Sequence, residues 1–191
     1  MTNPGRNLIV AISGASGVVY GMEMLKVLKD LGVNTHVVVS RAARQNLSIE
    51  TSYTMDDVRD VSTRVYGESD LAAPIASGSF FTMGMVVIPC SIKTLSGIAN
   101  CFATNLLIRA ADVTLKEKRP LVLVVRETPL HEGHLKLMLA AASMGAVILP
   151  PVPAFYHNPE TIEDLIRQTV GKVLDSLHIS HTLFKRWGAD E

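Results

Sequence analysis

Short runs of β-branched and aliphatic residues alternate with longer segments of helical periodicity along most of the chain, and this alternation restricts the fold more than any other feature. The runs that predict strands are 8–13, 35–39, 85–89, 121–125 and 146–149. The segments that predict helices are 18–31, 40–50, 92–100, 104–118, 132–144 and a final helix from 158. Strands that are separated by crossover helices pair in parallel. The sequence therefore predicts a three-layer α/β fold, Rossmann-like or flavodoxin-like, with a mostly parallel sheet and helices on both faces.

Composition agrees with a buried parallel sheet. Of the 191 residues 48% are apolar but only 5% are aromatic, so the core must be aliphatic. This length suits one domain, residues 1–191, in which 178–191 is expected to form a C-terminal arm. Cys90 and Cys101 lack a metal-ligand spacing, and we expect both to be small core residues.

Charge and hydropathy exclude several classes of protein. Eighteen basic and eighteen acidic residues give no net charge, which argues against a nucleic-acid partner. The first apolar run, 8–12, is too short for a signal peptide or a membrane span, so we expect a cytoplasmic protein with no membrane partner. With so little charge to keep chains apart, some apolar surface is expected to be covered by further copies of the chain.

Local signals define some helix ends better than others. Gly32 is expected to stop the helix over 18–31. Residues 51–84 give the weakest signal, with a helix predicted only over 56–61. Asn158 and Pro159 are expected to be the N-cap and first residue of the final helix, whose buried face would include Ile162.

Small and hydroxyl residues follow four of the predicted strands. These strand ends are Ser13–Gly17, Ser40, Pro89–Thr94 and Arg126–Thr128. Each precedes a helix, whose free backbone N–H groups and dipole favour an anion, so the set is suited to a phosphate. Neither the dinucleotide fingerprint nor the P-loop motif occurs, and a mononucleotide such as FMN fits better.

Taken singly, these residues also have structural explanations. Ser and Thr after a strand are usually helix caps. Arg126 and Glu127 could form an ion pair that closes the sheet, and Glu50 could be an ordinary carboxylate at a helix end. Lys116 lies in a charge run that is typical of a solvated helix C-terminus. The six histidines form no metal constellation, and no metal site is predicted.

Eight motifs in one order resemble the UbiX-type flavin prenyltransferases, from about residue 7 to Trp187. They are ISGASG at 12–17, SRAA at 40–43, SGSF at 77–80, PCSIKT at 89–94, RAAD at 109–112, LKEKRPL at 115–121, RETPL at 126–130 and PPVPAFYH at 150–157. The resemblance implies an enzyme that joins the dimethylallyl group of dimethylallyl phosphate to N5 and C6 of reduced FMN, without a metal ion. It also implies a homo-oligomer, expected to be a dodecamer, whose product serves a UbiD-type decarboxylase. Such proteins were formerly described as aromatic-acid decarboxylases.

The resemblance also assigns roles to individual residues. It implies FMN contacts at Gly14, Ala15, Ser16, Ser40, Ser91, Ile92, Lys93, Thr94 and Arg126. It implies contacts to the prenyl phosphate or its pocket at Arg109, Lys116, Tyr156, Lys172 and Trp187. The residues that it implies near the reacting flavin are Glu50, Ser16, Ser91 and Glu127, with the acid and base roles of the two carboxylates left open. Lys116 and Tyr156 are expected to act across subunit contacts.

Two other functions stay open at this point. An FMN-dependent cysteine decarboxylase would share the fold, but the 18–31 helix has no His and residues 89–94 read PCSIKT rather than PASANT. A non-catalytic flavin carrier would need the strand-end site but not the set of Glu50, Arg109, Lys116, Tyr156 and Lys172.

Overall fold

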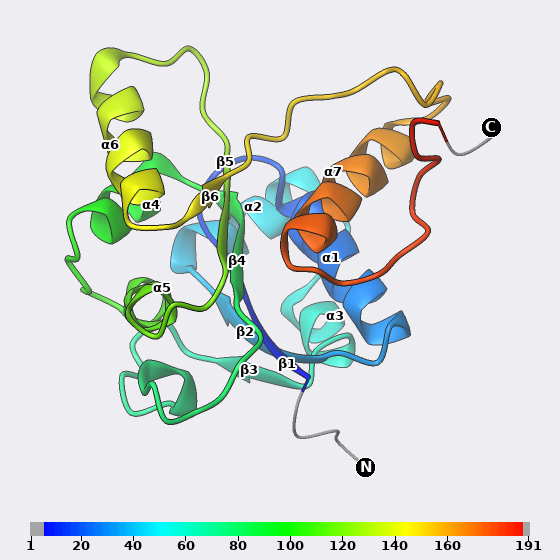
Figure 1. Cartoon of the computed structure of the whole chain (residues 1–191). Coiled ribbons are helices and arrows are strands. Elements are labelled where there is room, and N and C mark those ends of the chain that lie inside the picture. Colours follow the sequence, from blue (N-terminus) through cyan, green and yellow to red (C-terminus); the bar gives the residue numbers. More distant parts are fainter. Residues whose placement is uncertain (1–5, 189–191) are drawn as a thin grey trace.

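Six short strands of mostly Val, Ile and Leu form the centre of the protein (Figure 1). The structure is a computed structural model that describes residues 6–188. The strands are β1 (Asn7–Ile12), β2 (Asn34–Val39), β3 (Arg64–Tyr66), β4 (Met85–Cys90), β5 (Leu121–Val125) and β6 (Val147–Ile148). The α-helices are α1 (Val18–Asp30), α2 (Arg41–Glu50), α3 (Met55–Asp60), α4 (Ile92–Ala99), α5 (Leu106–Lys116), α6 (Glu132–Ser143) and α7 (Ile162–Ser176), and Pro74–Ala76 forms a 3-10 turn, η1. The predicted α/β fold is confirmed.

All strand pairs are parallel, in the order β3-β2-β1-β4-β5-β6. Leu8 of β1 lies opposite Thr35 of β2, and Ile9 lies opposite Met85 of β4. The chain thus builds outward from β1 in one direction and then, from β4, in the other. In such sheets the crevice at the carboxyl ends of the two strands where the order reverses is the usual ligand site.

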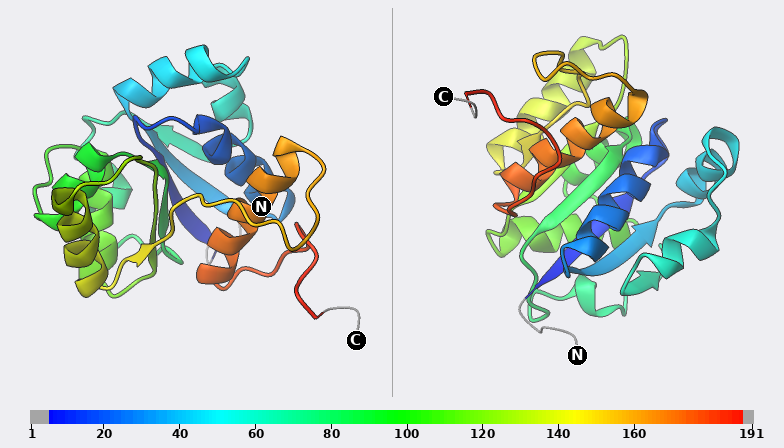
Figure 2. Two further views of the ribbon diagram at one scale, coloured as in Figure 1. Left: turned by 90° about the horizontal axis from the view of Figure 1, so that it is seen from above. Right: turned by 90° about the vertical axis from the view of Figure 1, so that its right-hand side faces the viewer.

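Alternate residues of each strand point into two separate aliphatic cores. Leu8, Val10 and Ile12 pack with α1, α2, α3 and α7, whereas Ile9 and Ala11 pack with α4, α5 and α6. Figures 1 and 2 show these two helical layers on opposite faces of the sheet. This period of two explains why the strands are apolar at nearly every position, since both faces are covered.

The start of the last helix differs from the prediction. Asn158 has a φ of 52°, outside the helical region, and α7 begins at Ile162. Thr161 is the N-cap, and its side chain and that of Asp164 form a capping box. Ile162 is 78% exposed, so its placement on the buried face was also wrong.

Two further differences concern β3 and Cys101. The three residues of β3 lie in the stretch with the weakest signal and pair only with β2, so pairing with a neighbour makes this strand rather than its own pattern. Cys90 is buried as expected, but Cys101 is exposed at the end of α4, in a turn with a φ of 53°.

Candidate functional site

Hydrogen bonds from and to Ser13 connect the carboxyl ends of the two central strands, β1 and β4. Its backbone N–H and its Oγ both donate to the carbonyl of Pro89, at 3.1 and 3.0 Å. The same Oγ accepts from the backbone N–H of Ser91 at 2.8 Å, and the Ser13 side chain is fully buried. The turn after β1 and the start of α4 therefore hold a fixed relative position at the edge where the strand order reverses.

Three helices begin at this edge, and their first N–H groups are satisfied in two ways. Ser40 Oγ accepts from Ala43 N–H in α2, and Ser91 Oγ accepts from Thr94 N–H in α4, so both are N-caps as the sequence predicts. Helix α1 begins at Val18, and its N-cap is Gly17, which has a φ of 98° and no side chain to cap the helix.

Glu50, the last residue of α2, serves the α1 start instead. Its Oε2 accepts from the N–H groups of Gly17 at 2.8 Å and Val18 at 3.2 Å. A carboxylate at a helix N-terminus is stabilised by both the free donors and the helix dipole. Glu50 is thus more than an ordinary helix-end carboxylate, because its hydrogen bonds to the start of α1 hold it beside the turn at Ser16.

A cavity of about 350 Å³ lies between these helix starts. Its walls are Gly14, Ser40, Arg41, Ala42, Gln45, Glu68, Ser91, Lys93, Thr94, Asn105 and Ile108. A Cβ on Gly14 would lie 2.4 Å from the Cβ of Ala42, so only glycine lets the β1–α1 turn approach α2 this closely. Hydroxyls, backbone N–H groups and the Lys93 ammonium make this cavity suitable for a phosphate ester.

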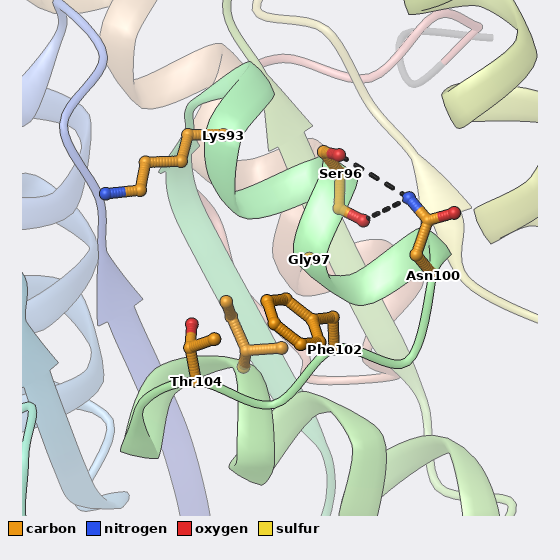
Figure 3. A pocket seen from close by; sticks show the side chains of 7 residues that line it. Lys93, Ser96, Gly97, Asn100, Phe102 and Thr104 are labelled. Atoms are coloured by element: carbon orange, nitrogen blue, oxygen red, sulfur yellow. Dashed lines mark hydrogen bonds between the residues drawn. The ribbon is translucent and has the colours of Figure 1, made fainter.

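A second cavity, of about 630 Å³, adjoins the first, because Lys93 and Ile108 line both. It lies between α4 and the segment that leads to α5, and Phe102 forms part of its wall (Figure 3). Asn100 Nδ2 donates to the Ser96 carbonyl at 2.7 Å, which keeps this side of the wall in place. A cavity of this volume, with apolar wall surface and several polar groups, is typical of small-molecule and cofactor sites.

Most of the residues expected to bind FMN lie at this edge. Gly14, Ser40, Ser91, Lys93 and Thr94 line the first cavity. Ala15 and Ser16 form the turn beside it. Ile92 does not line either cavity; its partly buried side chain packs against the core.

Arg126 and Glu127 follow β5, the next strand along. The backbone N–H of Arg126 donates to the carbonyl of Cys90, which joins this strand end to β4. Glu127 Oε1 accepts from Thr128 N–H at 3.0 Å. Within residues 6–188 the two side chains form no ion pair with each other, so the structural explanation for this pair does not hold.

Two residues of the cavity wall, Glu68 and Asn105, were not predicted from the sequence. Glu68 Oε2 accepts from Arg41 N–H at 2.7 Å at the start of α2, and it comes from the stretch that had no clear pattern. Asn105 caps α5 by accepting from Ile108 N–H, and an Asn before an apolar helical run is a signal that could have identified it.

The expected phosphate-binding cations fall into two groups. Arg109 and Lys116 lie on α5. Arg109 bonds to Asp112 at 2.8 Å and to the Ala76 carbonyl at 3.2 Å, and Lys116 pairs with Glu117. The ammonium beside Glu117 holds the pKa of that carboxyl below its usual value.

The second group lies on the opposite face of the sheet. Lys172 is on α7, and Tyr156 lies in the loop before that helix. The Tyr156 and Trp187 rings are 6.0 Å apart and nearly perpendicular, at 86°. Because α5 and α7 cover different faces, a single chain does not bring Arg109 and Lys116 together with Tyr156, Lys172 and Trp187.

The remaining reactive groups are structural or remote. Burial raises the pKa of the Cys90 thiol far above its usual range, which makes it a poor nucleophile. In the part of the chain that the structure describes, no three His, Cys, Asp or Glu residues are grouped as metal ligands. No helix among these residues is long and apolar enough to cross a bilayer.

The fold and the site together define a three-layer α/β protein with a polar cavity, suited to a phosphate, at the reversal point of its sheet. The family named Flavoprotein matches residues 1–183. The flavin prenyltransferase UbiX of Escherichia coli (strain K12) is 57% identical over 185 residues, covering 95% of this chain and 98% of that protein. The chain belongs to the flavoprotein family and, within it, to the UbiX flavin prenyltransferases.

Two solved structures are similar over nearly the whole chain. One is AnUbiX (PadA1) in complex with FMN and dimethylallyl pyrophosphate, with a TM-score of 0.95 and 48% identity, covering 96% of this chain and 98% of that one. The other is a dodecameric FMN-dependent UbiX-like decarboxylase from Escherichia coli O157:H7, with a TM-score of 0.93 and 46% identity, covering 96% of this chain and 100% of that one.

Proposed function

We propose that this protein is a flavin prenyltransferase that transfers the dimethylallyl group of dimethylallyl phosphate to N5 and C6 of reduced FMN, without a metal ion. The observation that carries the proposal is the polar cavity at Gly14, Ser40 and Ser91, which shares Lys93 and Ile108 with a larger cavity beside Phe102. The family relationship supports the same reaction. Prenylated FMN is the product.

The residues at the strand ends would bind FMN. The phosphate would accept hydrogen bonds from Ser40 and from the backbone around Ser91 to Thr94, with Lys93 supplying positive charge. Gly14, Ala15 and Ser16 would pass close to the flavin because their turn carries little side-chain bulk. Arg126 would contact the flavin from the end of β5. The phosphate donors belong to helix starts whose positions are already held by Ser13 and by the N-cap side chains.

The prenyl substrate depends on cations for its recognition. Its five carbons contribute at most about 4 kcal/mol, at roughly 0.8 kcal/mol per buried carbon, which corresponds to only millimolar binding. Arg109, Lys116, Lys172 and the Tyr156 hydroxyl would bind the phosphate and stabilise its charge as the allylic C–O bond breaks. Trp187 would stabilise the allylic cation through its π face.

Glu50 and Glu127 would transfer the protons of the reaction. When the C–O bond breaks, phosphate leaves with the electron pair and the carbon that carried it bonds to N5. The second bond, from the other end of the allyl group to C6, consumes the C=C bond, whose middle carbon takes up a proton. The flavin protons at these positions must be removed, and the leaving phosphate can be protonated. Glu50, which is fixed beside Ser16, and Glu127, at the end of β5, are the candidate acid and base.

Several copies of the chain would complete this site. Arg109 and Lys116 lie on one face of the sheet and Tyr156, Lys172 and Trp187 on the other, so both groups can reach one phosphate only if different chains supply them. Apolar side chains are exposed on and near α6, including Leu135 at 53% and Leu139 at 68%. These observations support a homo-oligomer, which we take to be a dodecamer.

The product, prenylated FMN, would be released and bound by a second enzyme. Prenylated FMN is of use only to a protein that performs chemistry with it, and we propose a UbiD-type decarboxylase in the cytoplasm as the recipient. The family relationship is the support for this step.

The deciding experiment mixes the protein with reduced FMN and dimethylallyl phosphate under anaerobic conditions. We expect a flavin adduct heavier by one dimethylallyl unit, detected by mass spectrometry and by its absorbance. Bound FMN without an adduct would favour a flavin carrier. Release of carbon dioxide from a peptide with a C-terminal cysteine would favour the cysteine-decarboxylase alternative.

Glu50→Gln tests the proton chemistry in the same assay. The Gln carbonyl can still accept from Gly17 and Val18, but it cannot exchange a proton, so adduct formation should slow by roughly 10²–10⁴-fold with FMN binding retained. Glu163→Gln, an exposed carboxylate on α7, is the matched control and should keep the full rate. A normal rate in Glu50→Gln would remove Glu50 from the mechanism.

A further inference from the structure

One carboxylate, that of Asp175 near the end of α7, meets three cationic or titratable side chains. Arg186 approaches it with both terminal nitrogens, Nη2 at 2.7 Å from Oδ1 and Nη1 at 3.2 Å from Oδ2. His181 Nε2 lies 3.1 Å from Oδ1, and Lys172 Nζ lies 3.5 Å from Oδ2. Arg186 and His181 belong to the C-terminal arm, which within the described chain is residues 178–188.

The contacts to the arm are partly withdrawn from solvent. The His181 side chain is 1% exposed and that of Asp175 is 24% exposed. His181 Nδ1 accepts from Leu183 N–H at 3.2 Å, so in the neutral ring Nε2 carries the proton and donates it to Asp175. Arg186 lowers the pKa of the Asp175 carboxyl, which is therefore charged at neutral pH. Two-pronged pairing of Arg with a carboxylate is strong and directional.

The surface of α7 is shaped to receive the same arm. Gly171 is buried, and a Cβ at this position would lie 2.5 Å from Phe184 Cε1 and 2.7 Å from His181 Cε1. The missing side chain makes the slot into which these two rings fit. Figures 1 and 2 show the arm running along the outer side of α7.

Trp187 of the arm meets the Tyr156 ring edge to face. Trp187 itself is 83% exposed, so its own burial does not hold it there. The preceding residue, Arg186, is the one that Asp175 binds. The position of Trp187 against Tyr156 thus depends on the link between Arg186 and α7.

We propose that Asp175 is a positioning residue for the prenyl-phosphate site: by holding the C-terminal arm on α7 it fixes Trp187 beside Tyr156. Through Lys172 the same carboxylate orients a cation of that site. The identity of the ligand rests on the proposed function, whereas the attachment of the arm does not.

The test uses Asp175→Asn in the full-length protein, together with the fact that Trp187 is the sole tryptophan. We expect lower residual anisotropy of the tryptophan fluorescence, because the arm moves more freely. We also expect the KM for dimethylallyl phosphate to rise about tenfold, the change for loss of one charged hydrogen bond. The KM for reduced FMN should stay within twofold, since neither α7 nor the arm lines the 350 Å³ cavity.

Glu163→Gln is the matched control, as it removes one exposed carboxylate from the same helix and should leave all three quantities unchanged. Arg186→Gln removes the same ion pair from the side of the arm. It should reproduce the loss of anisotropy and the change in KM even if Asp175→Asn fails to fold. Wild-type anisotropy and KM values in a folded variant would overturn the proposal. If the wild-type protein forms no adduct, the proposed function fails, but the anisotropy still decides whether Asp175 holds the arm.

Discussion

At the scale of single residues, side chains distant in sequence complete the helix starts around the cavity. Glu50 satisfies the first donors of α1, and Glu68 satisfies a donor of α2. Each carboxylate thus sits where an anionic ligand would be attracted. A phosphate at the α2 start would have to share or replace the bond from Arg41 N–H to Glu68.

His36, within β2, gives a pH-dependent prediction at this scale. Its ring Nδ1 is 2.8 Å from the Tyr66 hydroxyl, and burial, with a smaller effect of Arg64, lowers its pKa below the ordinary value of 6.5. The unfolded chain therefore binds a proton here more readily than the folded one, so stability is lost as the pH falls below 6.5 towards the lowered pKa of the folded state.

His36→Gln removes this titration. Denaturant unfolding measured from pH 8 to pH 5 should give a shallower decline of the free energy of unfolding in the variant than in the wild type. Parallel curves for the two proteins would show that His36 does not contribute to the pH dependence.

At the scale of elements, the sequence predicts those parts whose pattern is their own. β1, β4 and β5 are almost continuous apolar runs, β2 ends in three consecutive valines, and α1, α4 and α5 carry helical apolar faces, so the local pattern is enough to predict them. The predicted start of α7 was wrong because two N-cap signals lie within one turn of each other. Asn158-Pro159 is one and Thr161 with Asp164 is the other, and the capping box satisfies more donors.

The contact between the β1–α1 turn and α2 gives a prediction for Gly14→Ala. The new Cβ would lie 2.4 Å from the Cβ of Ala42, so the turn must move away and the 350 Å³ cavity must change shape. We expect FMN affinity to fall at least about tenfold, measured by flavin fluorescence quenching, because the phosphate donors lose their fixed positions.

Gly67→Ala is the control for that change. A Cβ on Gly67 meets nothing within 4 Å, and this residue does not line the cavity. Its FMN affinity should stay within twofold of wild type. Equal affinities of the two variants would contradict the role given to Gly14.

At the scale of the whole molecule, the separation of the two cationic groups by the sheet is the property with the largest consequence. The sequence places Lys116 and Tyr156 in separate motifs without saying whether they meet. The fold puts them on α5 and before α7, on opposite faces. The prenyl-phosphate site that we propose therefore needs residues from more than one chain.

Leu139→Glu tests the assembly. Leu139 is 68% exposed on α6, and a buried unpaired charge at a subunit contact would be costly, so light scattering should report a mass well below that of the wild-type oligomer. Prenylation should fall with it. Leu139→Met keeps the apolar character and should assemble normally. A wild-type oligomer in Leu139→Glu would place the subunit contacts elsewhere than on α6.

The alternation of short strands and helices by itself determined the α/β class, the aliphatic core and the strand ends that carry Gly14, Ser40 and Ser91, since these depend on local period and on residues adjacent in the chain. Tertiary structure alone decided the rest. It brought Glu50 to the start of α1, made a three-residue strand of Arg64–Tyr66 and bound the C-terminal arm to Asp175. The physical reason is that each of these features is a contact between segments far apart in sequence, and no local pattern encodes its geometry.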